Sequence, residues 1–271
     1  MRIVAGVEYN GQCYYGWQTQ TKPPLDTLQD QCEKALSKVA NHPVSVTCAG
    51  RTDRGVHALG QVIHFDTLSD RALHAWIAGT NHYLPSDIRL LWAKFIPFEF
   101  HARYSALTRC YRYILYNHPI RPALLAGKVS WYPIRLDVEK MQIGAQFLLG
   151  ENDFSAFRSA NCQSKSPIRR VDWIQILQLN QNFIEVKIQA NAFLHHMVRN
   201  IVGVLLEIGS EKHPPDWAQK VLISRQRNQG GVTALPHGLY LANVAYPTKW
   251  DIPTIDHRFF PILIDNYTHS P

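Results

Sequence analysis

The order of the expected strands and helices constrains the fold of this chain more than any other feature. The first part reads, in chain order, as a strand at 2–10, a helix at 27–42, strands at 43–50 and 60–67, a helix at 70–84 and a strand at 87–96. The strands are rich in β-branched and apolar residues, and the first helix carries Leu28, Cys32 and Leu36 at helical spacing after a suitable N-cap, Thr27 or Asp26. This β-α-β-β-α-β order is the ferredoxin-like pattern.

The second part of the chain repeats that order. Its expected elements are a strand at 110–118, a helix at 138–150, strands at 171–180 and 182–190, helices at 192–209 and 215–224, and a strand at 238–246. We therefore predict an α+β fold of two ferredoxin-like (βαββαβ) halves, whose antiparallel sheets meet around a central cleft. The first half is expected at 1–104 and the second at 105–246. A tail follows at 247–271, and we assign no role to its apolar stretch 259–264.

The composition favours a soluble protein with a polyanionic partner. Of the 271 residues, 46% are hydrophobic, which is enough for a large core, and the net charge is +7, a weak sign of RNA, DNA or acidic lipid as partner. The five cysteines form no CxxC pair, so we expect a reducing compartment without disulfides or a zinc cluster. No apolar run reaches the roughly 18 residues of a membrane span, and no signal peptide is recognisable, so we expect a cytoplasmic protein.

The stretch AGRTDRGVHALGQVIHF places Asp53 in a turn between two expected strands. Aspartate and Gly55 are common turn residues, because the carboxylate bonds nearby backbone N–H groups and glycine adopts a positive φ. A purely structural turn is therefore one interpretation. However, a turn does not require Arg51 and Arg54 on both sides of the aspartate, with His57 close behind. These neighbours favour a carboxylate that is held for chemistry.

Arg199 is a second candidate, in the middle of the helix expected at 192–209. Apolar residues cover most of the circumference of this helix, which indicates that it is buried. A buried guanidinium needs an anion or a strong polar partner. Asp53 can be that partner if the two halves face each other, and the pair would keep Asp53 ionised. A structural ion pair with another acid, or an end that reaches water, are the alternatives.

Seven segments of the chain share their residues and their order with one family. They are YNGQCYYGWQTQ, TLQDQCEKAL, AGRTDRGVHALGQVIHF, NHYLPSDI, FHARYSALTRCYRY, NAFLHHMVRNIVG and GGVTALPHGLYLANVAY. Together they resemble the TruA-type tRNA pseudouridine synthases over residues 2–246. The resemblance implies the pseudouridine synthase fold and an isomerase that uses no metal and no other cofactor.

The resemblance further implies a tRNA pseudouridine(38-40) synthase, which isomerises uridine at positions 38, 39 and 40 of the anticodon stem-loop. The C1′–N1 bond breaks, the uracil turns while bound, and a C1′–C5 bond forms. The family's nucleophilic aspartate corresponds to Asp53, which attacks either C6 of the base or C1′ of the ribose, while Arg199 keeps it ionised. The family's uracil-stacking tyrosine corresponds to Tyr111, whose phenol is also a candidate base. Strand alternation alone equally allows Tyr111 to be a core residue beside Tyr113.

The resemblance also implies the partners, namely the tRNA and a second copy of the chain in a homodimer. Arg51 would hold the site from which the uridine has been flipped out. Arg54 and His57 are close enough in sequence to contact neighbouring phosphates, although a solvated surface role is the alternative. Further basic residues could form a track for tRNA phosphates: Arg103, Arg109, Arg112, Lys165, Arg169, Arg170, Arg225 and Arg227.

Two other functions stay open. Two ferredoxin-like halves with exposed aromatic residues also fit a non-catalytic tandem RNA-binding module, although such a module does not need Asp53 and no strand carries the RNA-recognition consensus. A metal-dependent hydrolase could use His195 and His196. Adjacent residues on a helix point about 100° apart and seldom bind one metal ion together, and the sequence has no HExxH spacing. We therefore favour the isomerase.

Overall fold

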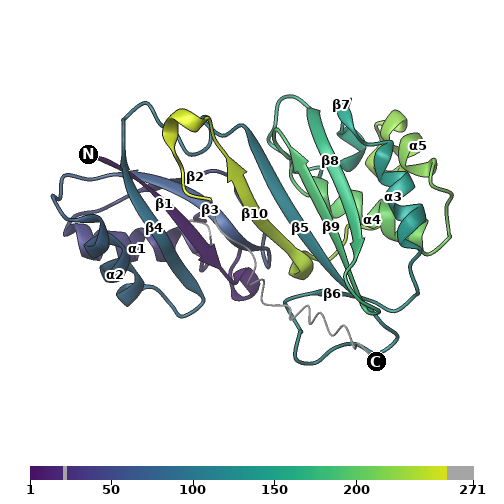
Figure 1. Ribbon diagram of the computed structural model, residues 1–271, viewed down its shortest axis with the longest axis horizontal. Helices are drawn as coiled ribbons and strands as arrows, with labels where there is room; N and C mark the ends of the chain where they lie inside the picture. The colour runs from purple at the N-terminus through teal and green to yellow at the C-terminus, as the bar shows by residue number, and fades with distance from the viewer. Residues whose placement is uncertain (21–22, 255–271) are drawn as a thin grey trace, which may run out of the picture.

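The computed structural model describes residues 1–20 and 23–254, which form one mixed sheet of ten strands with five α-helices (Figure 1). The strands are β1 (Arg2–Tyr9), β2 (Val46–Cys48), β3 (His57–Asp66), β4 (Ile88–Ile96), β5 (Thr108–Asn117), β6 (Ser130–Tyr132), β7 (Gly150–Asp153), β8 (Ile168–Gln178), β9 (Phe183–Ala190) and β10 (Leu239–Ala245). The helices are α1 (Leu28–Ala40), α2 (Leu73–Tyr83), α3 (Val138–Gln146), α4 (Met197–Gly209) and α5 (Trp217–Ser224).

A single parallel pair of strands joins the two halves of the chain. The sheet order is β4-β1-β3-β10-β5-β9-β8-β7, with β2 on β3 and β6 on β5. The last strand, β10, therefore lies between β3 of the first half and β5 of the second (Figure 1). It runs parallel to β3, with Tyr240 opposite His57, and antiparallel to β5. The α+β fold of two βαββαβ halves is confirmed, and the two sheets are continuous. The boundary at residue 104, between β4 and β5, stays a prediction.

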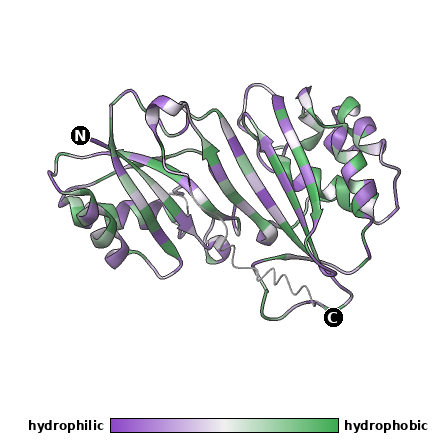
Figure 2. Ribbon diagram, viewed as in Figure 1, coloured by the Kyte–Doolittle hydropathy of each residue, from purple (hydrophilic) through white to green (hydrophobic). Residues whose placement is uncertain are grey.

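The helices form close to the predicted ranges, because one face of each can be buried against the sheet, although α3 ends at Gln146 and not at Gly150, where β7 begins. In α1, Leu28 and Leu36 are fully buried, and the Thr27 side chain accepts a hydrogen bond from the backbone N–H of Asp30 as the N-cap. Along the strands, bands of apolar and polar residues alternate (Figure 2). The short strands β6 and β7 were not predicted; they have only three and four residues, too few for a period-2 pattern to stand out.

The helix expected at 192–209 begins only at Met197, so this prediction was wrong at its N-terminal end. His196 precedes the helix with φ 65°, a left-handed conformation that interrupts the helical path. As a result, His195 and His196 lie outside the helix, and Arg199 lies in its first turn rather than in its middle.

Of the expected tail, residues 247–254 are described, and the apolar stretch 259–264 lies outside the described residues. Trp250 packs edge-on against Phe100, with 5.5 Å between the ring centroids, and Lys94 pairs with Asp251 at 2.6 Å. The start of the tail is thus attached to the first half of the sheet. Within the part of the chain that the structure describes, no helix combines the length and the apolar character needed to cross a membrane.

Candidate active site

Asp53 lies in a tight turn that connects β2 to β3. The backbone N–H of Val56 donates to the carbonyl oxygen of Asp53 at 3.1 Å, so that Arg54 and Gly55 form the tip of the turn. Gly55 has φ +77°, and a Cβ at this position would lie 3.2 Å from the Pro236 ring. Both facts favour glycine here, because other residues strain to adopt a positive φ. The turn holds the Asp53 side chain in one direction.

The loop after β1 supports this turn from behind. The backbone N–H of Trp17 donates to the carbonyl oxygen of Thr52 at 3.0 Å, and the hydroxyl groups of Tyr9 and Thr52 lie 2.8 Å apart. Gln61, which is fully buried, donates to the carbonyl oxygen of Gly50 at 2.6 Å. These contacts tie the backbone before Asp53 to buried neighbours, which favours a rigid site.

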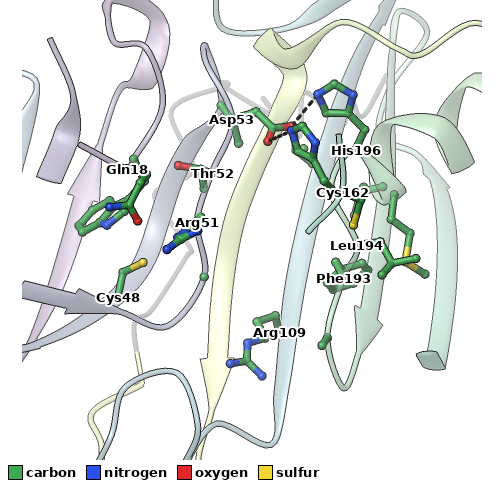
Figure 3. A pocket seen from close by; sticks show the side chains of 18 of the residues that line it. Gln18, Cys48, Arg51, Thr52, Asp53, Arg109, Cys162, Phe193, Leu194 and His196 are labelled. Atoms are coloured by element: carbon green, nitrogen blue, oxygen red, sulfur yellow. Dashed lines mark ion pairs between the residues drawn. The ribbon is translucent and has the colours of Figure 1, made fainter. Parts of the chain in front are cut away.

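A cleft of about 1260 Å³ lies between the two halves and contains Asp53. Its first-half wall is formed by residues 46–54 and 56 and by parts of the loop around Trp17. Its second-half wall is formed by residues 161–164 and 192–199, and Tyr111 and Arg109 of β5 also line it. Figure 3 shows Asp53 and His196 pointing toward one another from these two walls, with Arg51 and Arg109 along the cleft.

Three nitrogen-bearing side chains of the second half surround the Asp53 carboxylate. The Nη1 of Arg199 lies 3.4 Å from Oδ2, and the Nε2 of His196 lies 3.5 Å from the same oxygen. The Nε2 of His195 lies 3.3 Å from Oδ1. The Arg199 side chain is oriented by its Nε, which donates to the carbonyl oxygen of Ala234 at 2.8 Å. The structure thus brings Asp53 and Arg199 together as predicted.

The partners of Asp53 keep its carboxyl group ionised. Burial raises the pKa of Asp53. The hydrogen bond with His195 and the positive charges of His196, His195 and Arg199 lower the pKa by more than burial raises it, so it lies below the ordinary value of 3.8. Arg199 is the permanent charge among these groups. In return, the hydrogen bond to Asp53 raises the pKa of His195, whereas burial lowers the pKa of His196.

Tyr111 lies on β5 and lines the same cleft. It is only 8% exposed, and burial raises the pKa of its phenol. The ring of Phe193 packs edge-on against it, with 5.0 Å between the centroids. Tyr113, two residues further, is fully buried, and its hydroxyl donates to the carbonyl oxygen of Leu235 at 2.8 Å. The two tyrosines therefore differ: Tyr111 borders the cleft, and Tyr113 belongs to the core.

The three other predicted residues of the aspartate segment, Arg51, Arg54 and His57, differ in how far they are exposed. Arg51 is exposed and lines the cleft, and Arg54 is exposed with its guanidinium 4.2 Å from the centroid of the Tyr15 ring. His57 is 2% exposed, and its two ring nitrogens contact the backbone N–H of Gly11 and the carbonyl oxygen of His237. Burial lowers the pKa of His57 to about 4. The structure does not bring His57 into the cleft, because these two contacts hold its ring between Gly11 and His237.

Arg109 and Arg169 both line the cleft, and neither forms an ion pair with a carboxylate of the described residues. Arg109 is 9% exposed and donates to four carbonyl oxygens, among them those of Ala49 at 3.0 Å and Asn191 at 3.0 Å, which belong to different halves. Arg169 donates to the carbonyl oxygen of Ser166 at 3.0 Å and the hydroxyl of Ser164 at 2.7 Å. Both guanidinium groups leave an uncompensated positive charge beside the cleft.

Of the other members of the predicted basic track, Arg103 also lines the cleft, whereas four others are engaged elsewhere. Arg112 pairs with Glu185, Arg170 with Asp172, and Arg225 with Asp153. Arg227 donates to Gly231 and Thr233.

The sequence reasoning missed two contributions to this site, the histidine pair and Phe193. His195 and His196 were placed on a helix, where their rings would diverge, and this interpretation was wrong: the rings lie 4.0 Å apart and both face Asp53. The signal that could have identified them is their position four and three residues before Arg199 in NAFLHHMVRNIVG.

The chain was compared with known proteins. A family model described as tRNA pseudouridine synthase matches residues 5–105 and 145–247. A protein named tRNA pseudouridine synthase A from Coxiella burnetii is 55% identical over 252 residues, covering 93% of this chain and 95% of that protein. Another of the same name from Pseudomonas aeruginosa is 51% identical and covers 93% of this chain and 88% of that protein.

This chain belongs to the tRNA pseudouridine synthase family. The match includes Asp53 in its first segment and the histidine pair with Arg199 in its second, whereas Tyr111 lies between the two segments. Among solved structures, a Cbf5-Nop10-Gar1 complex covers 75% of this chain and 45% of that chain, with 13% identity and a TM-score of 0.36.

Proposed function

We propose that this protein isomerises uridine to pseudouridine at positions 38, 39 and 40 of the tRNA anticodon stem-loop. Membership of the family and the names of relatives that match 93% of the chain support the reaction and the class of substrate. The observation that carries the proposal is the Asp53 carboxylate, which is kept ionised in a cleft between the two halves by Arg199 and two histidines. A cleft of about 1260 Å³ has room for a nucleotide that has left its helix.

Asp53 is the nucleophile. A carboxylate that attacks C6 of the base or C1′ of the ribose forms a covalent intermediate, and this tethers the uracil while the C1′–N1 bond is replaced by a C1′–C5 bond. The attack requires the anion, and the lowered pKa of Asp53 supplies it at every physiological pH. Arg199 stabilises this charge from the opposite wall.

Tyr111 provides the flat surface on which the flipped uracil stacks. Its ring is fixed by β5 on one side and by the edge of Phe193 on the other, so little entropy is lost when the base binds. Because burial raises its pKa, the phenol stays protonated at neutral pH and can donate a hydrogen bond, but it is a poor base.

The arginines of the cleft bind the RNA backbone. Arg51 and Arg54, which are exposed on the aspartate turn, meet the phosphates on either side of the flipped nucleotide. Arg109 and Arg169 add positive charge deeper in the cleft, where no carboxylate of the described residues neutralises them. Phosphate contacts of this kind position the tRNA and make its affinity fall with salt. The protein acts as a homodimer in the cytoplasm, with one tRNA spanning both subunits.

The test uses anticodon stem-loops that carry tritium at C5 of a single uridine, placed at position 38, 39 or 40, and a fourth stem-loop labelled elsewhere. The C5 hydrogen is lost when the C1′–C5 bond forms, so released tritium measures turnover. We expect release from the first three RNAs, in the presence of EDTA, and none from the fourth. Tight binding of all four without release would instead support the tandem RNA-binding module.

A further inference from the structure

The two histidines that help to keep Asp53 ionised form a further arrangement with it. Nitrogen Nε2 of His195 and Nε2 of His196 face the two oxygens of the carboxylate at 3.3 and 3.5 Å. A charge-assisted hydrogen bond would be shorter, at about 2.7–2.9 Å. Two imidazoles and one carboxylate are therefore gathered around a common point without closing tightly on one another. All three ligand atoms lie within 4.8 Å of each other.

These separations are those of ligands around a zinc ion. Zinc lies about 2.0–2.2 Å from imidazole nitrogen and carboxylate oxygen, so the ligands of a tetrahedral site are about 3.4 Å apart. The 3.3 Å from His195 to Oδ1 and the 3.5 Å from His196 to Oδ2 are close to that edge, so a small adjustment of the side chains would bring both nitrogens and one carboxylate oxygen around one ion. The side chains of Asp53, His195 and His196 remain 23%, 38% and 28% exposed, so an ion can enter from the cleft and keep water as its fourth ligand.

The backbone keeps the three ligands in place. His196 is held at φ 65°, a conformation that costs energy for a residue other than glycine and persists only where the surroundings fix it. The backbone N–H of Asn200 donates to the carbonyl oxygen of His196 at 2.9 Å, and that of Ser159 donates to the carbonyl oxygen of His195 at 2.9 Å. Asp53 is fixed independently by its turn. The site is therefore largely preorganised.

We propose that Asp53, His195 and His196 bind a divalent transition-metal ion of the zinc type, and that this ion blocks the nucleophile. The two imidazoles select zinc over magnesium and calcium, which prefer sites made of oxygen atoms. Bound zinc would occupy the carboxylate oxygens that the proposed reaction needs, so zinc is a competitive inhibitor of isomerisation and not a cofactor. The inhibition rests on the proposed function, whereas the binding does not.

Arg199 also affects the binding of a metal ion at this site. Its guanidinium lies 3.4 Å from Oδ2 of Asp53, so it repels an incoming cation and limits the affinity for zinc. Replacing Arg199 with glutamine should therefore tighten zinc binding while it slows isomerisation. A residue that merely supported the local structure would weaken both.

Zinc binding is measured on the tag-free protein without RNA, by equilibrium dialysis and by the visible absorption of Co²⁺ as a zinc substitute. We expect one ion per chain, an affinity about 10–100-fold lower in His195→Ala and in His196→Gln, and a higher affinity in Arg199→Gln. His82→Ala is the matched control, because His82 is an exposed histidine on α2 and should not alter binding.

In the tritium-release assay, added zinc should inhibit the wild-type protein, EDTA should restore its activity, and magnesium should not inhibit. Wild-type zinc affinity in both His195→Ala and His196→Gln would overturn the proposed site. An inactive protein that binds zinc as expected would instead contradict the proposed function and leave the metal site standing.

Discussion

The guanidinium of Arg199 reaches Asp53 across the cleft, with 3.4 Å between Nη1 and Oδ2, although the two residues are 146 positions apart in the chain. Arg199 stands in the first turn of α4 in the second half, and Asp53 in the β2–β3 turn of the first. The pair therefore exists only when β10 has joined the two sheets. A break in this junction would separate the proposed nucleophile, Asp53, from the charge of Arg199 that favours its ionised form.

Asp53→Asn should abolish isomerisation while the protein still folds and binds tRNA. The amide has nearly the same shape as the carboxylate but is no nucleophile, so we expect tritium release to fall by about 10⁴-fold or more. Single-turnover tritium release measures the reaction, and filter binding measures the affinity for tRNA. Asp216→Asn is the control, because Asp216 lies at the start of α5 and pairs with Lys220, away from the cleft. Turnover near the wild-type rate in Asp53→Asn would remove Asp53 from its role.

Arg199→Ala should reduce both stability and rate. The substitution leaves the carbonyl oxygen of Ala234 and the partly buried Asp53 without this donor, so the free energy of unfolding should fall by about 1–3 kcal/mol. The pKa of Asp53 should also rise, because a cation that favours its charged form has been removed. The acid limb of the kcat/KM profile should then move to higher pH. An unchanged melting temperature together with an unchanged profile would refute the pairing.

The pKa of His195 predicts how stability changes with pH. Its hydrogen bond to Asp53 raises the pKa above the ordinary 6.5, so the folded protein holds this proton more tightly than the unfolded chain. The resulting stabilisation is complete below pH 6.5 and is lost as the pH rises through the raised pKa. The His195→Gln variant should not show this loss of stability as the pH rises. Melting temperatures of both proteins, measured upward from pH 6, check the difference.

Other histidines do not obscure this comparison. The pKa values of His57, His64, His101, His196 and His237 are lowered, so within the described residues these groups titrate below the window in which His195 acts. Groups that titrate in the window in both proteins cancel in the difference. Parallel curves for the wild type and His195→Gln would show that the contact with Asp53 does not raise this pKa.

Tyr111→Ala and Tyr111→Phe should separate the ring from its hydroxyl group. The alanine variant loses a buried aromatic ring packed on Phe193, so the free energy of unfolding should fall by about 3–5 kcal/mol and turnover should be lost. The phenylalanine variant keeps the ring, and its melting temperature and tRNA affinity should stay near those of the wild type. Denaturant unfolding and binding assays measure these effects. Weak tRNA binding by Tyr111→Phe would show that the hydroxyl group, and not the ring alone, contacts the RNA.

The sequence by itself indicated most of the elements and the candidate nucleophile. The period of apolar residues and the Thr27 cap are local properties, so they predicted α1 close to its observed bounds. Asp53 stood out because arginines and a glycine surround it within a few positions. The ordered motifs indicated the family, and the comparisons confirmed it.

Only the tertiary structure decided what surrounds Asp53. His195 and His196 read as helical because their neighbours have helical spacing, and the left-handed backbone of His196 that ends this pattern is set by packing and not by its local propensity. His57 read as a candidate for phosphate binding, but β10 pairs with β3 at this residue and Tyr240 stacks on its ring at 4.6 Å. Contacts between residues so distant along the chain leave no periodic signal in the sequence, because they arise from the pairing of strands from opposite halves.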